Sequence, residues 1–159
     1  MRVQPYAIET ITRAHEDHIL EVAFCPEHKL FATCCSDSTA RIWDWETRQL
    51  VNTLQYHTAS VTCIRWNDHI GRWITGSDDR TLRTWKCDGA VVEVPGIADF
   101  INCPDAVSTL CIDETYGMAV VALVDRTICV IDAEKAEIIM VMSGHTDSIR
   151  SIVHIPKVR

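Results

Sequence analysis

The chain has 159 residues, of which 47% are hydrophobic and 23% are charged, a composition typical of a soluble globular domain with a real core. Its formal net charge of −7 argues against general affinity for nucleic acid or anionic membranes, and no apolar run approaches the roughly 18–20 residues of a membrane span. The N-terminal residues show no apolar region of the kind found in secretory signals, so we expect an intracellular protein.

The eight cysteines are expected to be reduced thiols that serve as small hydrophobic side chains. None belongs to a CxxC pair, and most fall in apolar runs such as 61–64. The ligand spacings of known zinc sites are missing as well. We therefore predict no structural disulfide, no metal and no cofactor.

One segment of the chain occurs in two similar copies, 42 residues apart. His15 precedes Trp43 by 28 residues, and His57 precedes Trp85 by the same 28. Such a period indicates a repeat architecture, in which each copy is one supersecondary unit that buries its faces against its neighbours.

The register of the repeat reveals two further copies. Asp37 and Asp79 each follow their histidine by 22 residues, and Asp125 has the same turn context, which places a third mark at Cys103. His145 marks a fourth copy. The marks are then separated by 42, 46 and 42 residues, and the four extra residues are assigned to a longer loop within 87–102.

Each copy is predicted to form four short strands, a to d, separated by turns, and no segment has a sustained helical period. We expect an N-terminal strand at about 6–13, a first blade at about 15–54, a second at 57–94, a degenerate third at 103–142 and the start of a fourth at 145–156. In chain order, the predicted strands are 6–12, 19–24, 30–34, one ending at Trp43, 49–54, 61–66, 73–76, one ending at Trp85, 90–94, 107–112, 118–123, one ending at Ile131, 136–142 and 149–154.

A period near 42 with His, Asp and Trp at these offsets resembles the WD40-repeat family. Trp43-Asp44 matches the dipeptide that names the family, and Gly144-His145 matches its GH signature. The resemblance covers most of the chain and implies an all-β fold, a β-propeller of four-stranded antiparallel blades around a central channel. Three whole blades with an extra strand at each end would form only an arc of such a ring, so residues 1–159 are expected to be part of a larger propeller.

The resemblance also implies a buried hydrogen-bonded tetrad in each well-formed blade, in which Trp, Thr, His and Asp satisfy one another. The third copy has Cys103, Val121 and Ile131 in place of His, Thr and Trp, and keeps only Asp125. The tetrad residues are expected to be His15, Thr33, Asp37 and Trp43 in the first blade, and His57, Thr75, Asp79 and Trp85 in the second.

A repeated His, Asp and Thr constellation also suggests a hydrolase, because such enzymes combine a base, an acid and a hydroxyl nucleophile. The structural interpretation is favoured, since the constellation occurs twice, its threonine lies on a predicted strand between Trp and His, and no Gly-x-Ser-x-Gly elbow is present. We therefore predict no catalytic residue.

The expected function is that of a non-catalytic scaffold for protein–protein interaction within a larger complex, with the remaining propeller blades, from a longer protein or another chain, among its partners. The alternative is a structural subunit of a cytoskeletal or ciliary assembly, located at the cytoskeleton or cilium. Turns b–c and connections d–a should share one end of the blades and form the partner-binding face. That face is expected to present Glu16, His18, Ser36, Thr58, Ser60, Asp78, Val124, Arg126 and Ser148.

Overall fold

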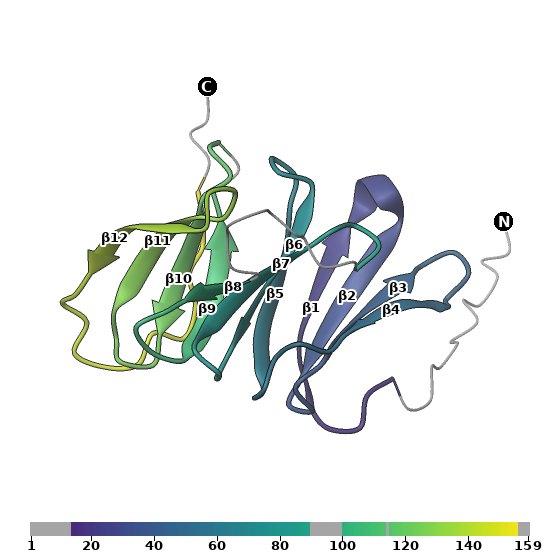
Figure 1. Ribbon diagram of the computed structural model, residues 1–159, viewed down its shortest axis with the longest axis horizontal. Helices are drawn as coiled ribbons and strands as arrows, with labels where there is room; N and C mark the ends of the chain where they lie inside the picture. Colours follow the sequence, from purple (N-terminus) through teal and green to yellow (C-terminus); the bar gives the residue numbers. More distant parts are fainter. Residues whose placement is uncertain (1–13, 90–99, 114, 156–159) are drawn as a thin grey trace, which may run out of the picture.

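The computed structural model describes residues 14–89, 100–113 and 115–155, so the predicted N-terminal strand lies outside the described residues. Within this part of the chain, twelve strands form three four-stranded antiparallel sheets, and each sheet takes its strands in sequence order (Figure 1). The predicted all-β fold is confirmed. The described part contains one short 3-10 helix, η1 (Pro26–His28), and no helix long and apolar enough to cross a membrane.

The first sheet, which we call blade 1, contains β1 (Ile19–Cys25), β2 (Leu30–Cys35), β3 (Ala40–Asp44) and β4 (Leu50–Leu54). Its second strand is buried at five of its six positions, because it lies inside the sheet, whereas β4 has only one buried residue. The tight turn between β2 and β3 places Ser38 at φ 67°, in the left-handed region.

The second sheet, blade 2, contains β5 (Val61–Asn67), β6 (Arg72–Ser77), β7 (Thr81–Trp85) and β8 (Phe100–Asn102). Its fourth strand differs from the sequence prediction. The predicted strand 90–94 lies outside the described residues, and the strand that pairs with β7 comes from the end of the segment assigned to the longer loop. The reason is that the extra residues of this copy precede its fourth strand instead of following it.

The third sheet, blade 3, contains β9 (Val107–Ile112), β10 (Ala119–Leu123), β11 (Ile128–Asp132) and β12 (Glu137–Met142). The copy with the missing tetrad therefore still folds as a complete blade. Its turns also have the backbone of a well-formed copy, because Arg126 has φ 74° where Arg80 has φ 66° in blade 2.

Residues 149–154, predicted to be a further strand, are not a strand in the structure. A first strand of a blade pairs with the second strand of the same blade, and the described residues contain no such partner for this segment. The segment is nevertheless held beside β9, because Ser108 Oγ donates a hydrogen bond to the carbonyl oxygen of Ile149 at 3.2 Å. Arg126 also donates to the carbonyl oxygen of Thr146, at 3.2 Å.

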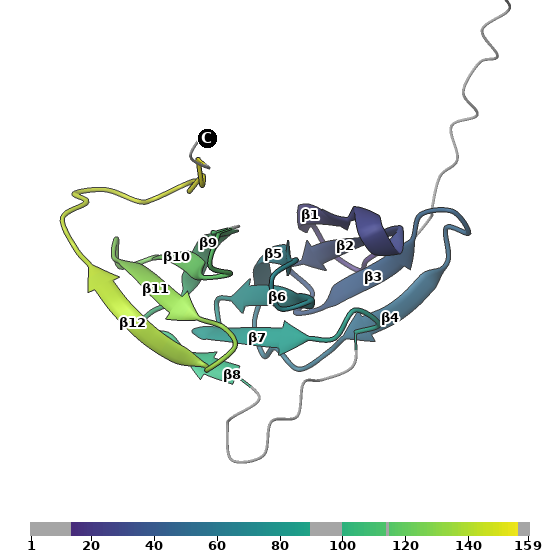
Figure 2. The same cartoon turned by 90° about the horizontal axis from the view of Figure 1, so that it is seen from above.

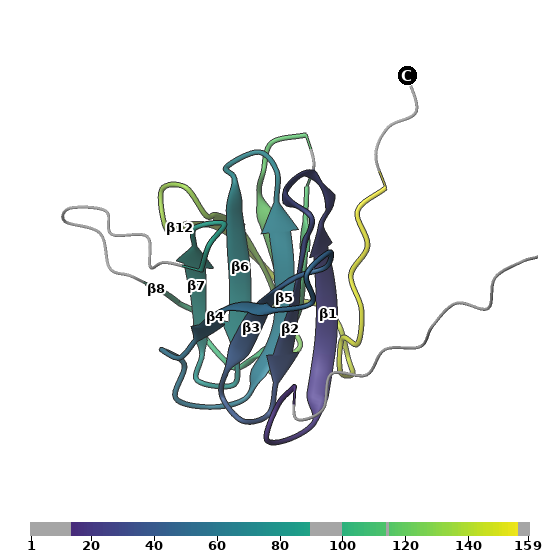
Figure 3. The ribbon, with the colours of Figure 1, turned by 90° about the vertical axis from the view of Figure 1, so that its right-hand side faces the viewer.

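The three blades follow one another in an arc, with the first strands β1, β5 and β9 adjacent along its inner side and the fourth strands along its outer side (Figure 2). Seen from the side, the blades stack face to face (Figure 3). The core consists of two apolar clusters, one at each seam between blades. Trp73 and Trp85 of blade 2 belong to the cluster shared with blade 1, and Ile74 and Leu82 belong to the cluster shared with blade 3.

Each first strand carries a one-residue bulge at the same place in the repeat. The pairing skips Leu20 in β1, Thr62 in β5 and Ser108 in β9, and each skipped residue lies five positions after its copy's mark. A bulge re-aims a side chain that would otherwise lie in the ladder. In β5 and β9 the re-aimed side chain is a hydroxyl that reaches the following segment of the arc.

Candidate functional site

The His, Thr, Asp and Trp predicted for blade 1 meet inside the sheet. Trp43 Nε1 donates to Thr33 Oγ1 at 3.0 Å, and Thr33 Oγ1 lies 2.7 Å from His15 Nε2. His15 Nδ1 lies 3.1 Å from Asp37 Oδ2. The chain of contacts runs from β3 through β2 to the loop before β1 and then to the β2–β3 turn, so it joins four separate parts of the blade.

Blade 2 repeats this arrangement with deeper burial and with a shorter contact between histidine and aspartate. Trp85 Nε1 donates to Thr75 Oγ1 at 2.9 Å, and Thr75 Oγ1 lies 2.8 Å from His57 Nε2. His57 Nδ1 lies 2.8 Å from Asp79 Oδ2. These groups are better enclosed than those of blade 1 because blade 1 covers this face of blade 2.

Each network has members that the sequence prediction did not include. Thr39 and Thr81 donate their hydroxyls to Asp37 and Asp79, at 2.6 Å in both cases, and their backbone N–H groups donate to the same carboxylates at 2.9 Å. The backbone N–H that follows each histidine donates to the other carboxylate oxygen. The Asp-x-Thr spacing, which all three copies share, was the signal for this contact.

The hydrogen bonds fix the protonation of the histidines. Each threonine hydroxyl accepts the tryptophan N–H and has one proton to give, so it donates to Nε2, and Nδ1 carries the proton donated to aspartate. Burial lowers the pKa of His15 and His57 below the ordinary value, although the aspartate acts to raise it. Both histidines are therefore held as neutral donors to a charged carboxylate.

The geometry fits a structural role better than catalysis. Thr33 and Thr75 are buried, and each hydroxyl oxygen already accepts a tryptophan N–H, which reduces its nucleophilicity and blocks approach of a substrate. Neither threonine is among the residues that line the pocket around Arg65 and His154 or the pocket around Ile128 and His145. What the constellation can do chemically is fasten four blade segments together.

In blade 3 the same positions form an apolar column. Cys103, Val121 and Ile131 are all buried and belong to the cluster shared with blade 2. Asp125 remains, and its Oδ1 accepts the backbone N–H and the hydroxyl of Thr127 at 2.9 and 2.6 Å. Replacing three polar partners together leaves no buried group unsatisfied, which a partial network would do.

The loops expected to form one face do lie together. Hydrogen bonds of 2.9–3.0 Å join each β-turn between second and third strands to the connection before the first strand of the same blade: Ser36 N to His18 O, Asp78 N to Ser60 O and Val124 N to Ala106 O. Of the nine residues predicted for this face, Ser36 and Ser60 are half-buried and the other seven are exposed. We call this surface the loop face.

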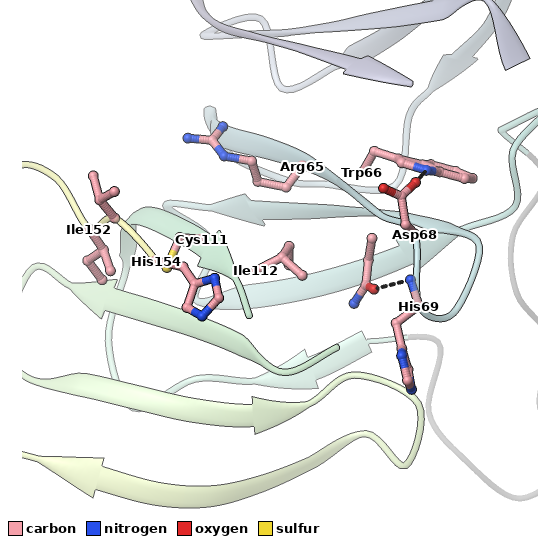
Figure 4. Close-up of a pocket in the computed structure, with 10 residues that line it drawn as sticks. Arg65, Trp66, Asp68, His69, Cys111, Ile112, Ile152 and His154 are labelled. Atoms are coloured by element: carbon pink, nitrogen blue, oxygen red, sulfur yellow. Dashed lines mark hydrogen bonds between the residues drawn. The ribbon is translucent and has the colours of Figure 1, made fainter. Parts of the chain in front are cut away.

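At the end of the blades opposite the loop face lies a recess that the sequence did not indicate. It has a volume of about 520 Å³ and lies between the ends of β5 and β9 and the segment that follows β12 (Figure 4). His154 Nε2 lies 3.2 Å from Asp113 Oδ1, which holds the last described residues over the recess. Its lining residues are Arg65, Trp66, Asn67, Asp68, His69, Cys111, Ile112, Ile152, Val153 and His154.

The recess has mixed chemistry. Arg65 is neutralised by an ion pair with Glu21 of blade 1, and Asp68 accepts the indole N–H of Trp66. Burial raises the pKa of Cys111, so its thiol stays protonated at neutral pH. No pattern in the sequence could have identified this recess, because its residues come from two blades and from a segment outside any sheet.

Comparison with known proteins agrees with this architecture. The family model described as "WD domain, G-beta repeat" matches residues 7–44 and 48–86. Mitochondrial division protein 1 of Candida glabrata is 26% identical over 88 residues, which are 53% of this chain and 12% of that protein. Transducin-like enhancer protein 2 of Mus musculus is 36% identical over 64 residues, or 40% of this chain and 8% of that protein.

A third relative is the NACHT domain- and WD repeat-containing protein 1 of Mus musculus, which is 37% identical over 77 residues, or 48% of this chain and 5% of that protein. The aligned parts thus span from 5% to 12% of the length of these three relatives. The similarity is to the repeat unit and not to the whole of any of them.

Proposed function

This chain belongs to the WD40-repeat family, and we propose that it is a non-catalytic scaffold that binds other proteins within a larger complex. The observation that supports this most is the loop face, where exposed side chains from all three blades gather at one end of rigid sheets. Loops held by a rigid framework are where proteins place binding residues, because the framework fixes the geometry at little cost in entropy.

The character of the loop face supports a polar protein partner. Exposed charges of both signs lie close together on it, Asp78 with Arg80 over blade 2 and Asp125 with Arg126 over blade 3. Such a mixed charged surface favours a partner with a matching pattern, because complementary charges steer association and select among partners. The net charge of −7 makes nucleic acid an unsuitable partner.

A second class of partner is suggested by the flanks of the arc. Val22 is 45% exposed on the face of blade 1 that points away from blade 2. Ile64, at the equivalent position of blade 2, is 0% exposed because blade 1 covers it. At the other flank all six residues of β12 are exposed, five of them apolar. We propose that further propeller blades, of a longer protein or of another chain, cover both flanks.

Site-specific photo-crosslinking tests the scaffold role. A crosslinking residue at Thr58, on the loop face, should capture a discrete protein in native extract. The matched control is Lys86, which is also exposed but lies at the opposite end of the same blade. Capture from Lys86 but not from Thr58, or no capture from any position of the loop face, would exclude the loop face as the partner-binding surface.

A further inference from the structure

Three metal-ligating side chains meet at the seam between blades 1 and 2. Cys25 ends β1, His28 ends the 3-10 turn η1 that follows, and Cys87 comes two residues after β7. The two sulfur atoms and a ring nitrogen of His28 all lie within 4.8 Å of one another. Cys25 is buried, Cys87 is half-buried and His28 is exposed, so the group opens to solvent on one side.

The backbone on both sides of the seam holds these side chains in place. Pro26 begins η1, and Lys29, at φ 56°, closes it by donating its N–H to the Pro26 carbonyl, which returns His28 toward Cys25. The ring of His28 packs edge-on against Trp66 at 5.7 Å between centroids. Trp73 Nε1 donates to the carbonyl oxygen of Cys87 at 3.2 Å. The ligand positions are therefore set before any ion arrives.

Blade architecture does not explain the combination. In blade 1 the position equivalent to Cys87 is Trp45, and in blade 3 the positions equivalent to Cys25 and His28 are Asp113 and Tyr116. A first strand can thus end without cysteine, and this turn can be built without histidine. The set occurs once in the described residues, where one blade supplies two ligands and the next supplies the third.

We propose that Cys25, His28 and Cys87 bind one Zn²⁺ ion and thereby fasten blade 1 to blade 2. Two thiolates and one imidazole form the sulfur and nitrogen donor set that zinc prefers, with a fourth position left for water. Zinc bonds of about 2.3 Å to sulfur and about 2.0–2.1 Å to nitrogen place the donor atoms of a tetrahedral site less than 4.8 Å apart, which is compatible with the spacing of these three atoms.

Binding releases two protons, one from each thiol, and the product of Zn²⁺, two thiolates and a neutral imidazole carries no net charge. Burial raises the pKa of Cys25 to about 12, and it also raises the pKa of Cys87, so both thiols are protonated at neutral pH without metal. Zinc must displace these protons, so its affinity should rise with pH.

Cobalt is the probe for the test, because Co²⁺ bound by thiolates absorbs light through sulfur-to-metal charge transfer. The full chain, kept reduced with a phosphine, is titrated with Co²⁺ and then with Zn²⁺. We expect one Co²⁺ per chain with charge-transfer absorption, displaced by one Zn²⁺. Cys87→Ser and His28→Gln should each weaken binding at least about tenfold. The matched controls Cys129→Ala and His69→Gln should bind like the unaltered chain.

A second measurement does not depend on variants folding. Bound Zn²⁺ should slow alkylation of Cys87 in the unaltered chain, as read by peptide mass. The proposal is overturned if Co²⁺ gives no charge-transfer absorption, if Cys87→Ser binds as tightly as the unaltered chain, or if zinc leaves alkylation of Cys87 unchanged. It is also overturned if chains trapped directly from cells carry a Cys25–Cys87 disulfide.

Discussion

Thr62 Oγ1 donates a hydrogen bond of 2.7 Å to the carbonyl oxygen of Val107, 45 residues further along the chain. Thr62 is the bulged residue of β5 and Val107 opens β9, so one hydroxyl joins the inner strands of two consecutive blades. Ser108, the bulged residue of β9, makes the equivalent contact to Ile149 at 3.2 Å. The bulge is therefore a device for joining one unit of the arc to the next.

Thr62→Val keeps the shape of the side chain and removes this link. We expect the free energy of unfolding to fall by about 0.5–1.5 kcal/mol, the usual net contribution of one hydrogen bond. Urea denaturation followed by circular dichroism measures it, with Thr58→Val, whose side chain is exposed, as the control. Equal stability of the two variants would show that the hydroxyl does not join the blades.

Gly76 marks a second close approach between blades 2 and 3. A Cβ atom at this position would lie 2.5 Å from Val107 Cγ1 and 2.7 Å from Cys63 Sγ, so Gly76→Ala should cost about 1–3 kcal/mol through overpacking. Adding Val107→Ala should recover part of this loss. In a double-mutant cycle from chemical denaturation, strictly additive effects would contradict the contact.

Thr33→Ala tests whether the tetrad is structural. It leaves Trp43 Nε1 and His15 Nε2 without their shared partner, and we expect a loss of roughly 1–3 kcal/mol in unfolding free energy. Thermal and urea denaturation measure this loss, with Thr58→Ala as the control. A hydrolytic activity that disappears in a fully stable Thr33→Ala protein would instead support a catalytic role.

Stability should fall as the solution becomes acidic. Unfolded histidines gain protons below their ordinary pKa of 6.5, whereas burial lowers the pKa of His15 and His57 in the folded state. The stabilisation that these two neutral histidines contribute is therefore complete above pH 6.5 and is lost as the pH falls below it. In Asp79, burial acts to raise the pKa, but hydrogen bonds from Thr81 and Thr58 outweigh it and lower the pKa, which extends the loss below pH 3.8. The urea midpoint of unfolding, measured between pH 8 and 5, checks this. It should fall less in His57→Gln than in the unaltered chain. An equal fall in both would contradict the role given to His57.

Much of the fold followed from the sequence because each repeat carries its own local pattern. The strands of blade 1 are marked by short apolar segments and by turns whose residues lie at constant offsets from His15, and the structure places them within one or two residues of the prediction. The hidden third copy was found because its turn still needs Asp125, although its core had become apolar.

The structural features that were not predicted from the sequence depend on contacts between blades. The fourth strand of blade 2 could not be placed because the register marks do not say on which side of an insertion the strand lies. Residues 149–154 have strand-like composition, but a strand also needs a partner. The meeting of Cys25 with Cys87 joins residues 62 apart in the chain, and their spacing matches no known zinc motif.

Light scattering on the purified chain tests most directly whether it acts as an open arc that recruits further blades. Phe24 is 58% exposed on one flank and Val141 is 54% exposed on the other, and apolar faces of this extent favour association. We predict assemblies well above the 18.0 kDa of one chain, shifted toward the monomer by Phe24→Glu. A folded, monodisperse monomer of 18.0 kDa at high concentration would contradict the proposal.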